Sequence, residues 1–158
     1  MHKQIAIAAD HAGFEDKEKV KKMLDRMGSS YEDFGTVSTE SVDYPDYARK
    51  VAEAVANGEV DNGLLVCGSG NGMAIAANKV PGIRAAVAWS EEIARLAREH
   101  NDANVLSLAA RFTAEDEIEN IITAWLNAKF DGGRHERRVE KIAEIEREEL
   151  QGGKTTTA

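Results

Sequence analysis

The residues best suited to chemistry in this 158-residue chain follow two short apolar runs. Asp10 and His11 come directly after the run from Ile5 to Ala9, and Cys67 ends the run that begins at Leu64. A glycine-rich segment, residues 68–72, follows Cys67 at once. Because ligands of open parallel sheets bind beyond the carboxyl ends of the strands, we expect both groups to line one site.

The glycine-rich segment 68–72 predicts a tight turn that points several backbone N–H groups at one place. Such a nest of N–H groups suits an oxyanion or a phosphate. Two nucleotide-binding fingerprints are absent, because Met73 stands where the dinucleotide pattern needs a glycine and no phosphate-loop sequence occurs. A glycine-rich turn with a purely structural role is the alternative.

Cys67 is the single cysteine of the chain, which excludes an intrachain disulfide and a tetrathiolate zinc site. It also favours a reducing, cytoplasmic location. A lone cysteine is more often a small buried hydrophobic residue than a reactive thiol. At a strand end that faces a nest of N–H groups, its thiol has a physical reason to be an accessible thiolate, which could act as base or nucleophile. Ser69 could relay a proton or hold a substrate hydroxyl, or be an ordinary turn serine.

A basic cluster opens the last predicted helix. Arg134 and Arg138 are four residues apart, so they share one helical face near an N-terminus, where the helix dipole also favours anions. We interpret them as a phosphate clamp, which Arg111 could join; ion pairs with glutamates of the same helix are the alternative. His100 and Asn101 stand in a polar segment before an apolar strand, where ordinary turn formers are also common.

Metal ligation receives little support from the sequence. Asp10 and His11 could bind a polyol, a phosphate or a metal, but a metal site needs further ligands. No regular spacing links the candidates His100 and His135 to each other. We therefore expect neither a metal nor another cofactor.

Composition indicates one packed core and a soluble protein. The chain is 42% hydrophobic and 30% charged, which suits one domain of this length. Its net charge of −8 disfavours nucleic acid and acidic membranes as partners, so an anionic ligand must be captured by local groups. The first apolar run is too short for a signal peptide, and no run is long enough to span a bilayer.

Short apolar runs alternate with longer segments of helical period, a pattern typical of βα units that feed a parallel sheet. Strands are expected at 5–9, 31–34, 64–67, 83–89 and 105–108. Helices are expected around 20–27, 47–55, 74–78, 91–99, 118–126 and 134–150. Ser90 predicts a helix N-cap, and Thr113 begins a predicted capping box. The fold class is therefore α/β, a three-layer α/β/α Rossmann-like domain over residues 1–150 with a five-stranded, mostly parallel sheet, followed by a disordered tail at 151–158.

Five separated motifs resemble type B ribose-5-phosphate isomerases, within the wider ribose/galactose isomerase family, over about residues 4–148. In chain order they are Asp10-His11-Ala12-Gly13, Ser41 to Tyr47, Cys67 to Met73 with its continuation to Lys79, His100-Asn101-Asp102, and Gly132 to Arg138. The resemblance implies a metal-free aldose–ketose isomerase, an intramolecular oxidoreductase of the pentose phosphate pathway. Such an enzyme interconverts ribose 5-phosphate and ribulose 5-phosphate through a cis-enediolate.

The resemblance also implies roles for individual residues. Cys67 is implied as the base that moves a proton between the first two carbons, with Ser69 assisting at the hydroxyl and His100 helping to open the sugar ring. The residues implied to hold the substrate are Asp10, His11, Gly68, Gly70, Asn71, Gly72 and Asn101. The positions that match phosphate binding are His11, Arg111, Arg134 and Arg138. One branch of the family has a glutamate base where Met73 stands, so this chain resembles the cysteine branch.

Two alternatives stay open at this point. An isomerase of allose or galactose 6-phosphate would share these motifs, and pocket length rather than sequence distinguishes the sugars. A non-catalytic module that binds a phosphorylated metabolite could also use a nest and an arginine clamp.

The predicted sheet places the two groups of polar residues apart within one chain. Asp10 and Cys67 follow their strands, whereas His100 and Asn101 precede one. In a parallel sheet the two pairs therefore lie at opposite ends of the strands. A strand of four or five residues spans roughly 13–17 Å, too far for His100 and Cys67 to share one small sugar. We therefore expect a homo-oligomer, a dimer or a dimer of dimers, in which each active site takes residues from two chains.

Overall fold

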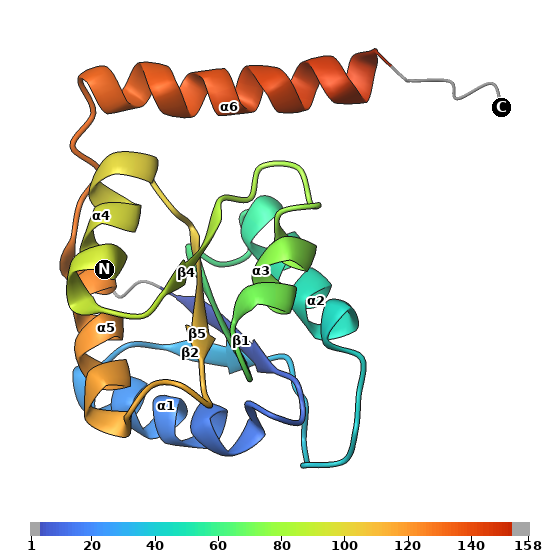
Figure 1. Ribbon diagram of the computed structural model, residues 1–158, viewed down its shortest axis with the longest axis vertical. Coiled ribbons are helices and arrows are strands. Elements are labelled where there is room, and N and C mark those ends of the chain that lie inside the picture. The colour runs from blue at the N-terminus through green and yellow to red at the C-terminus, as the bar shows by residue number, and fades with distance from the viewer. Residues whose placement is uncertain (1–3, 153–158) are drawn as a thin grey trace, which may run out of the picture.

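The computed structural model describes residues 4–152, which form a parallel five-stranded sheet with helices on both faces (Figure 1). The strands are β1 (Ile5–Ala9), β2 (Tyr31–Asp33), β3 (Asn62–Cys67), β4 (Ala85–Ala88) and β5 (Val105–Ala109). The helices are α1 (Phe14–Met27), α2 (Tyr44–Ala56), α3 (Asn71–Ala77), α4 (Glu91–Asn101), α5 (Glu115–Asn127) and α6 (Arg134–Gln151). The predicted three-layer α/β/α fold is confirmed.

Side chains alternate between two cores, one on each face of the sheet. In β1, Ile5, Ile7 and Ala9 pack with α1, α4 and α5. Ala6 and Ala8 pack with α2 and α3 on the opposite face. Burial on both faces holds β1, β3 and β5 in register, and it therefore fixes where the loops after these strands begin.

The strand order β2-β1-β3-β5-β4 reverses direction between β1 and β3. The register pairs Ala9 with Val66, so Asp10 and Cys67 occupy the next position on adjacent strands. The Asp10 N–H donates to the Val66 carbonyl at 3.3 Å, which continues the pairing beyond β1. Residues that follow strands at such a reversal are the usual place for a ligand in an open α/β sheet.

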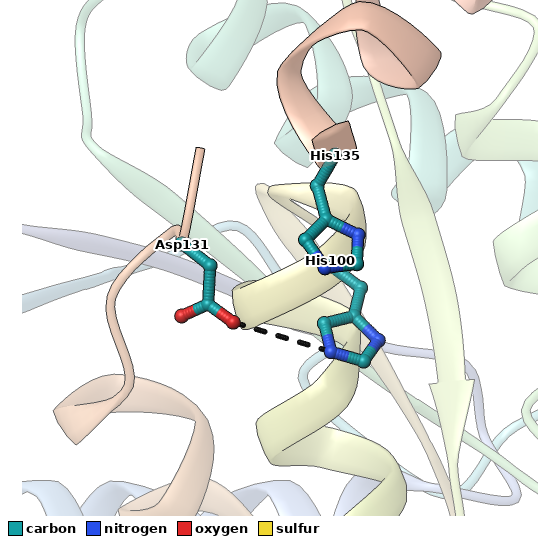
Figure 2. Close-up of side chains that lie close together, drawn as sticks. All are labelled: His100, Asp131 and His135. Atoms are coloured by element: carbon teal, nitrogen blue, oxygen red, sulfur yellow. Dashed lines mark ion pairs between the residues drawn. The ribbon is translucent and has the colours of Figure 1, made fainter. Parts of the chain in front are cut away.

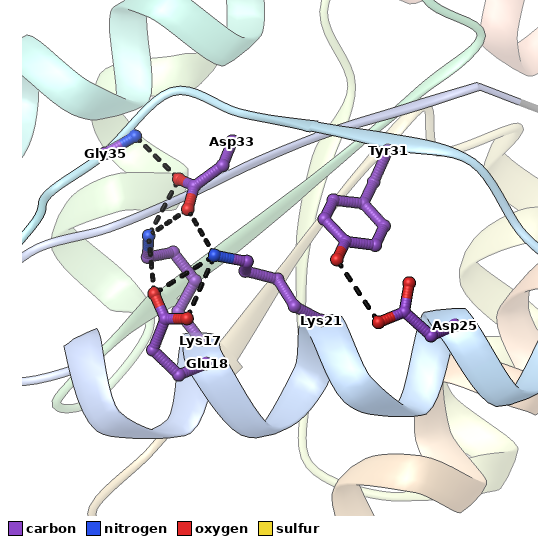
Figure 3. Close-up of polar contacts among 7 residues, drawn as sticks. All are labelled: Lys17, Glu18, Lys21, Asp25, Tyr31, Asp33 and Gly35. Carbon is purple, nitrogen blue, oxygen red and sulfur yellow. Dashed lines mark hydrogen bonds and ion pairs between the residues drawn. The ribbon is translucent and has the colours of Figure 1, made fainter.

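A buried ion-pair network ties α1 to the edge strand β2 (Figure 3). The Lys17 side chain is fully buried, and its ammonium donates to both carboxylate oxygens of Asp33 at 2.7 and 2.6 Å. Lys21 and the Gly35 N–H donate to the same carboxylate at 2.9 and 2.8 Å. Burial favours a raised pKa for Asp33, but these donors outweigh it and lower the pKa. The network fixes the chain after β2, whose Gly35 carbonyl accepts from the Ala9 N–H at the end of β1.

Several predicted boundaries differ from the structure. The strand expected at 83–89 covers only Ala85–Ala88. It begins after Arg84 because the Arg84 N–H donates to the Asn104 side-chain oxygen rather than to a neighbouring strand. The capping box at Thr113 is wrong, since α5 has Ala114 as its N-cap and no side-chain hydrogen bond there. The Ser90 cap is confirmed, because its hydroxyl accepts from the Ile93 N–H at 3.2 Å.

Helix α6 crosses one end of the molecule beside the C-terminus of α4 (Figure 1). Within α6, His135 is buried, whereas Ile142, Ile145 and Leu150 are exposed. The helix includes Gln151, which was expected to lie in the disordered tail, and residues 153–158 of that prediction lie outside the described residues. No helix between residues 4 and 152 combines the length and hydropathy needed to cross a membrane.

Candidate active site

The Cys67 sulfur lies in a nest of backbone N–H groups at the end of β3. Burial raises the pKa of the thiol, and the charge of Asp10 raises it further. Hydrogen bonds from the N–H groups of Met73, Gly70 and Ser69 oppose this effect but do not overcome it. The predicted nest is therefore present, but Cys67 is 5% exposed and its raised pKa favours the thiol over the accessible thiolate expected from the sequence.

A hydrogen bond joins the glycine-rich turn to β5. Gly70 has φ +80°, in the left-handed region that glycine adopts without strain. The Gly70 carbonyl accepts a 2.7 Å hydrogen bond from the buried hydroxyl of Ser107. Ser69 is exposed, and its hydroxyl accepts from the Asn71 N–H at 3.3 Å. Ser107 was not identified from the sequence, although a lone hydroxyl inside an apolar strand is the signal that points to it.

Asp10 is held by the first turn of α1. One of its carboxylate oxygens accepts from the Gly13 N–H at 2.9 Å, and the other has no hydrogen-bond partner between residues 4 and 152. Gly13 permits this arrangement, because a Cβ there would lie only 2.1 Å from the Val66 carbonyl oxygen. His11 follows, and its Nδ1 accepts from the Val42 N–H at 3.2 Å, which holds the segment before α2 close to the end of β1.

Two further side chains flank the glycine-rich turn. A Cβ built on Gly72 would lie 2.7 Å from the Tyr44 ring, so this half-exposed ring covers Gly72. A Cβ on Gly68 would lie 3.2 Å from the Arg111 guanidinium, and the Arg111 N–H donates to the Gly68 carbonyl at 3.0 Å. The sequence placed Tyr44 within a motif without giving it a role, and it placed Arg111 with Arg134 and Arg138 rather than beside Gly68.

His100 and Asn101 lie at the end of α4, on the side of the sheet where the strands begin (Figure 1). Figure 2 shows the His100 ring stacked on that of His135, with ring centroids 4.1 Å apart and planes 8° from parallel. The His100 Nε2 lies 4.0 Å from a carboxylate oxygen of Asp131. Burial lowers the pKa of His135, and the neighbouring His100 and Arg134 lower it further. The structure thus brings together two histidines that no sequence spacing linked.

The three candidate phosphate-binding arginines do not form one cluster within a chain. Arg111 lies beside Gly68, whereas Arg134 and Arg138 lie on α6 near His100. These arginines are separated because α5 returns the chain from the carboxyl ends of the strands to their amino ends. Neither Arg134 nor Arg138 forms an ion pair within the described part of the chain, so the alternative of helical Arg–Glu pairs is not observed.

A buried network supports the end of α4 that carries His100. The Arg98 guanidinium donates to the side-chain oxygens of Asn62 and Asp102 and lies over the Trp125 ring at 4.8 Å. Asp102 adopts φ +47° and terminates the helix. This cluster explains why a long cationic side chain is buried there, and it fixes the orientation of the last turn of α4.

Comparisons with known proteins agree with this architecture. The profile of the ribose/galactose isomerase family matches residues 5–142. Ribose-5-phosphate isomerase B of Escherichia coli K12 is 49% identical over 144 residues, which cover 91% of this chain and 97% of the relative. The structure of ribose-5-phosphate isomerase B from Clostridium thermocellum is 52% identical with a TM-score of 0.91, over 92% of this chain and 98% of that one.

A third relative was solved with a ligand. Ribose-5-phosphate isomerase B of Mycoplasma genitalium, with bound ribulose-5-phosphate, is 43% identical with a TM-score of 0.87, over 92% of this chain and 97% of that one. The family resemblance inferred from the five motifs is thereby confirmed: the chain belongs to the ribose/galactose isomerase family.

Proposed function

We propose that this chain is an aldose–ketose isomerase that interconverts ribose 5-phosphate and ribulose 5-phosphate, a reaction of the pentose phosphate pathway. The observation that carries the proposal is the Cys67 thiol, set in a nest of N–H groups beside Asp10 at the reversal of the sheet. Similarity to proteins named ribose-5-phosphate isomerase B, one of them with bound ribulose-5-phosphate, supports the choice of sugar. The single cysteine supports a reducing, cytoplasmic location.

The reaction moves one hydrogen from the second carbon of the sugar to the first and one proton from the second oxygen to the first, so its atoms and electrons balance within the substrate. As thiolate, Cys67 removes the proton from the second carbon and returns it to the first, while Ser69 helps to move the hydroxyl proton. The intermediate enediolate carries negative charge on oxygen. N–H groups of the turn formed by Gly68, Ser69, Gly70, Asn71 and Gly72 are suited to stabilise that charge, by several kcal/mol if two or more of them contact it.

A complete site in this proposal needs a second chain. Within one chain, Cys67 has Asp10, His11 and Arg111 nearby, while His100 lies at the opposite end of the strands. We infer a two-fold dimer, or a dimer of dimers, in which His100 and Asn101 of the partner subunit open the sugar ring and hold its oxygens. Arg134 and Arg138 of the partner subunit then bind the phosphate together with Arg111. The exposed apolar residues of α6 support burial against another copy.

The test of the substrate compares kcat/KM for ribose 5-phosphate with that for allose 6-phosphate and galactose 6-phosphate. We expect ribose 5-phosphate to be preferred. A preference of about tenfold or more for either hexose contradicts the proposed substrate and favours the hexose alternative.

The test of catalysis replaces the base. Cys67→Ala and the size-matched Cys67→Ser lower kcat by about 100-fold or more, because the base acts mainly in the transition state. Sugar-phosphate binding, followed by calorimetry, stays nearly unchanged. A chain that binds ribose 5-phosphate but never converts it is the non-catalytic module instead. An unchanged kcat in the variants removes Cys67 from the mechanism.

A further inference from the structure

A second cluster of ligand atoms, separate from Cys67, lies where α4 and α6 meet. His100 ends α4, His135 lies in the first turn of α6, and Asp131 lies in the segment before it. One donor atom from each residue, two imidazole nitrogens and a carboxylate oxygen, lies within 4.8 Å of the other two. Figure 2 shows the three side chains converging from these separate segments.

The backbone holds these three residues together. The Asp131 N–H donates to the Glu99 carbonyl at 2.9 Å, which joins the segment to the last turn of α4. Gly132 and Gly133 have φ +67° and +56°, and this pair of left-handed residues turns the chain sharply into α6. The His135 N–H donates to the Gly132 carbonyl at 3.0 Å and closes that turn. Only side-chain rotations are therefore needed to adjust the ligand atoms.

The His135 ring lacks a polar partner. It is 8% exposed, yet neither ring nitrogen has a hydrogen bond to a protein group between residues 4 and 152. Among the described residues only Arg98 Nε is a buried side-chain nitrogen or oxygen without a hydrogen-bond partner, so the His135 nitrogens remain accessible to solvent and to an ion. The stacked ring of His100 supplies a second imidazole at the same place, and Asp131 supplies a carboxylate.

We propose that His100, Asp131 and His135 bind one Zn²⁺ ion, and that the bound ion keeps His100 from acting on the sugar. Two imidazoles and a carboxylate form the donor set of zinc sites that keep a fourth position open. Ligand atoms of tetrahedral zinc lie about 3.3 Å apart, as follows from zinc–ligand distances of about 2.0–2.2 Å. The present atoms therefore need to approach by at most about 1.5 Å.

The ring geometry defines the movement required. Because the two imidazole planes are nearly parallel, their nitrogen lone pairs cannot point at one ion until one ring turns about its side-chain bonds. The His100 side chain is 38% exposed and Asp131 49% exposed, so both have room to turn. Zinc suits this donor set better than Mg²⁺ or Ca²⁺, which prefer oxygen ligands. Asp131 offsets part of the charge of the ion, whereas Arg134 and Arg138 oppose it.

The direct test measures zinc binding without relying on activity. Zn²⁺ is titrated calorimetrically into Cys67→Ser protein, in which the thiol cannot contribute a ligand. We expect one ion per chain. Adding His135→Gln or Asp131→Asn to the Cys67→Ser protein should weaken zinc binding by about tenfold or more. The matched controls His11→Gln and Asp25→Asn change the affinity by less than about twofold. Because Asp131 is exposed, its variant keeps the test valid if His135→Gln fails to fold.

Spectroscopy adds a check on the geometry, because tetrahedral Co²⁺ absorbs visible light much more strongly than octahedral Co²⁺. Co²⁺ added to Cys67→Ser protein should give the strong tetrahedral bands, and Asp131→Asn should abolish them. Equal zinc affinity in all variants, or no binding of millimolar Zn²⁺, overturns the site.

The inhibitory effect rests on the proposed function and has its own test. Zn²⁺ should inhibit isomerisation by protein with Cys67 intact, EDTA should restore activity, and Asp131→Asn should need about tenfold more Zn²⁺. Equal inhibition of both proteins places the inhibitory ion elsewhere and contradicts this effect. Absence of isomerase activity in metal-free protein refutes the proposed function, whereas the calorimetric titration still decides whether the zinc site exists.

Discussion

Asp10 and Cys67 are neighbours at the carboxyl ends of β1 and β3, and the aspartate raises the pKa of the thiol beyond the effect of burial. The backbone N–H groups of the turn act in the opposite direction. Asp10, which we propose holds substrate oxygens, therefore also reduces the supply of thiolate before the substrate arrives. The nest then has two roles, since the same donors that favour the thiolate can stabilise an enediolate.

Asp10→Asn should lower the pKa of Cys67, because it removes a nearby negative charge while keeping an oxygen that can accept from the Gly13 N–H. A lower pKa means more thiolate at neutral pH. The pH profile of iodoacetamide alkylation measures the pKa, with Asp25→Asn as a control at an exposed aspartate of α1. A pKa that stays constant or rises contradicts the coupling between Asp10 and Cys67.

Arg134→Ala and Arg138→Ala should raise KM for ribose 5-phosphate by roughly tenfold or more, since each removes a charge-assisted contact to phosphate. Their effect on free ribose should be much smaller. Arg147→Ala is the matched control, because the helical period of α6 places the exposed Arg147 on the face opposite both of them. Equal effects on both sugars mean that these arginines have a structural role.

Gly13→Ala should destabilise the chain by more than about 3 kcal/mol, because the new methyl group would meet the Val66 carbonyl oxygen at 2.1 Å. Gly28→Ala is the control. Gly28 has a positive φ but no heavy atom within 4 Å of a Cβ, so only the backbone cost of about 1–2 kcal/mol applies. Urea unfolding measures both values. If Gly13→Ala costs no more than Gly28→Ala, the close approach of α1 to β3 is wrong.

Asp33→Asn should destabilise the chain by about 3 kcal/mol at neutral pH, since it leaves the buried Lys17 ammonium poorly paired. The lowered pKa of Asp33 gives the sign of the pH dependence. Its stabilising contribution is complete above the unfolded pKa and is lost as the pH falls through the folded pKa. Urea midpoints of the two proteins should therefore converge in acid. A constant difference across the acid range contradicts this account.

The sequence predicted the fold well because hydrophobic period and turn residues act locally. Burial on both faces made the runs at 5–9 and 64–67 recognisable as central strands, and the order of elements then implied a parallel sheet. The ends of elements were less accurate than their order along the chain. Asn104 binds the Arg84 N–H and shortens β4, and Ala114 rather than Thr113 caps α5.

The candidate site was predictable where residues lie directly at the carboxyl ends of strands, as Asp10 and Cys67 do. It was not predictable where tertiary packing decides. Burial of the Cys67 thiol depends on how β1, α2 and α3 pack into one core around it, and this burial reverses the expected effect of the nest. The stacking of His100 on His135 likewise depends on the reversal at Gly132 and Gly133.

The shared active site is tested most directly by mixing two inactive proteins. Cys67→Ala and His100→Ala chains are combined in equal amounts after subunit exchange, which is verified by mass spectrometry of differently labelled chains. Random exchange makes about half the dimers mixed, and each mixed dimer holds one intact and one doubly damaged site. The account predicts recovery of about one quarter of the unsubstituted activity if the sites act independently. No recovery despite verified exchange would contradict it, because Cys67 and His100 would then serve the same chain's site.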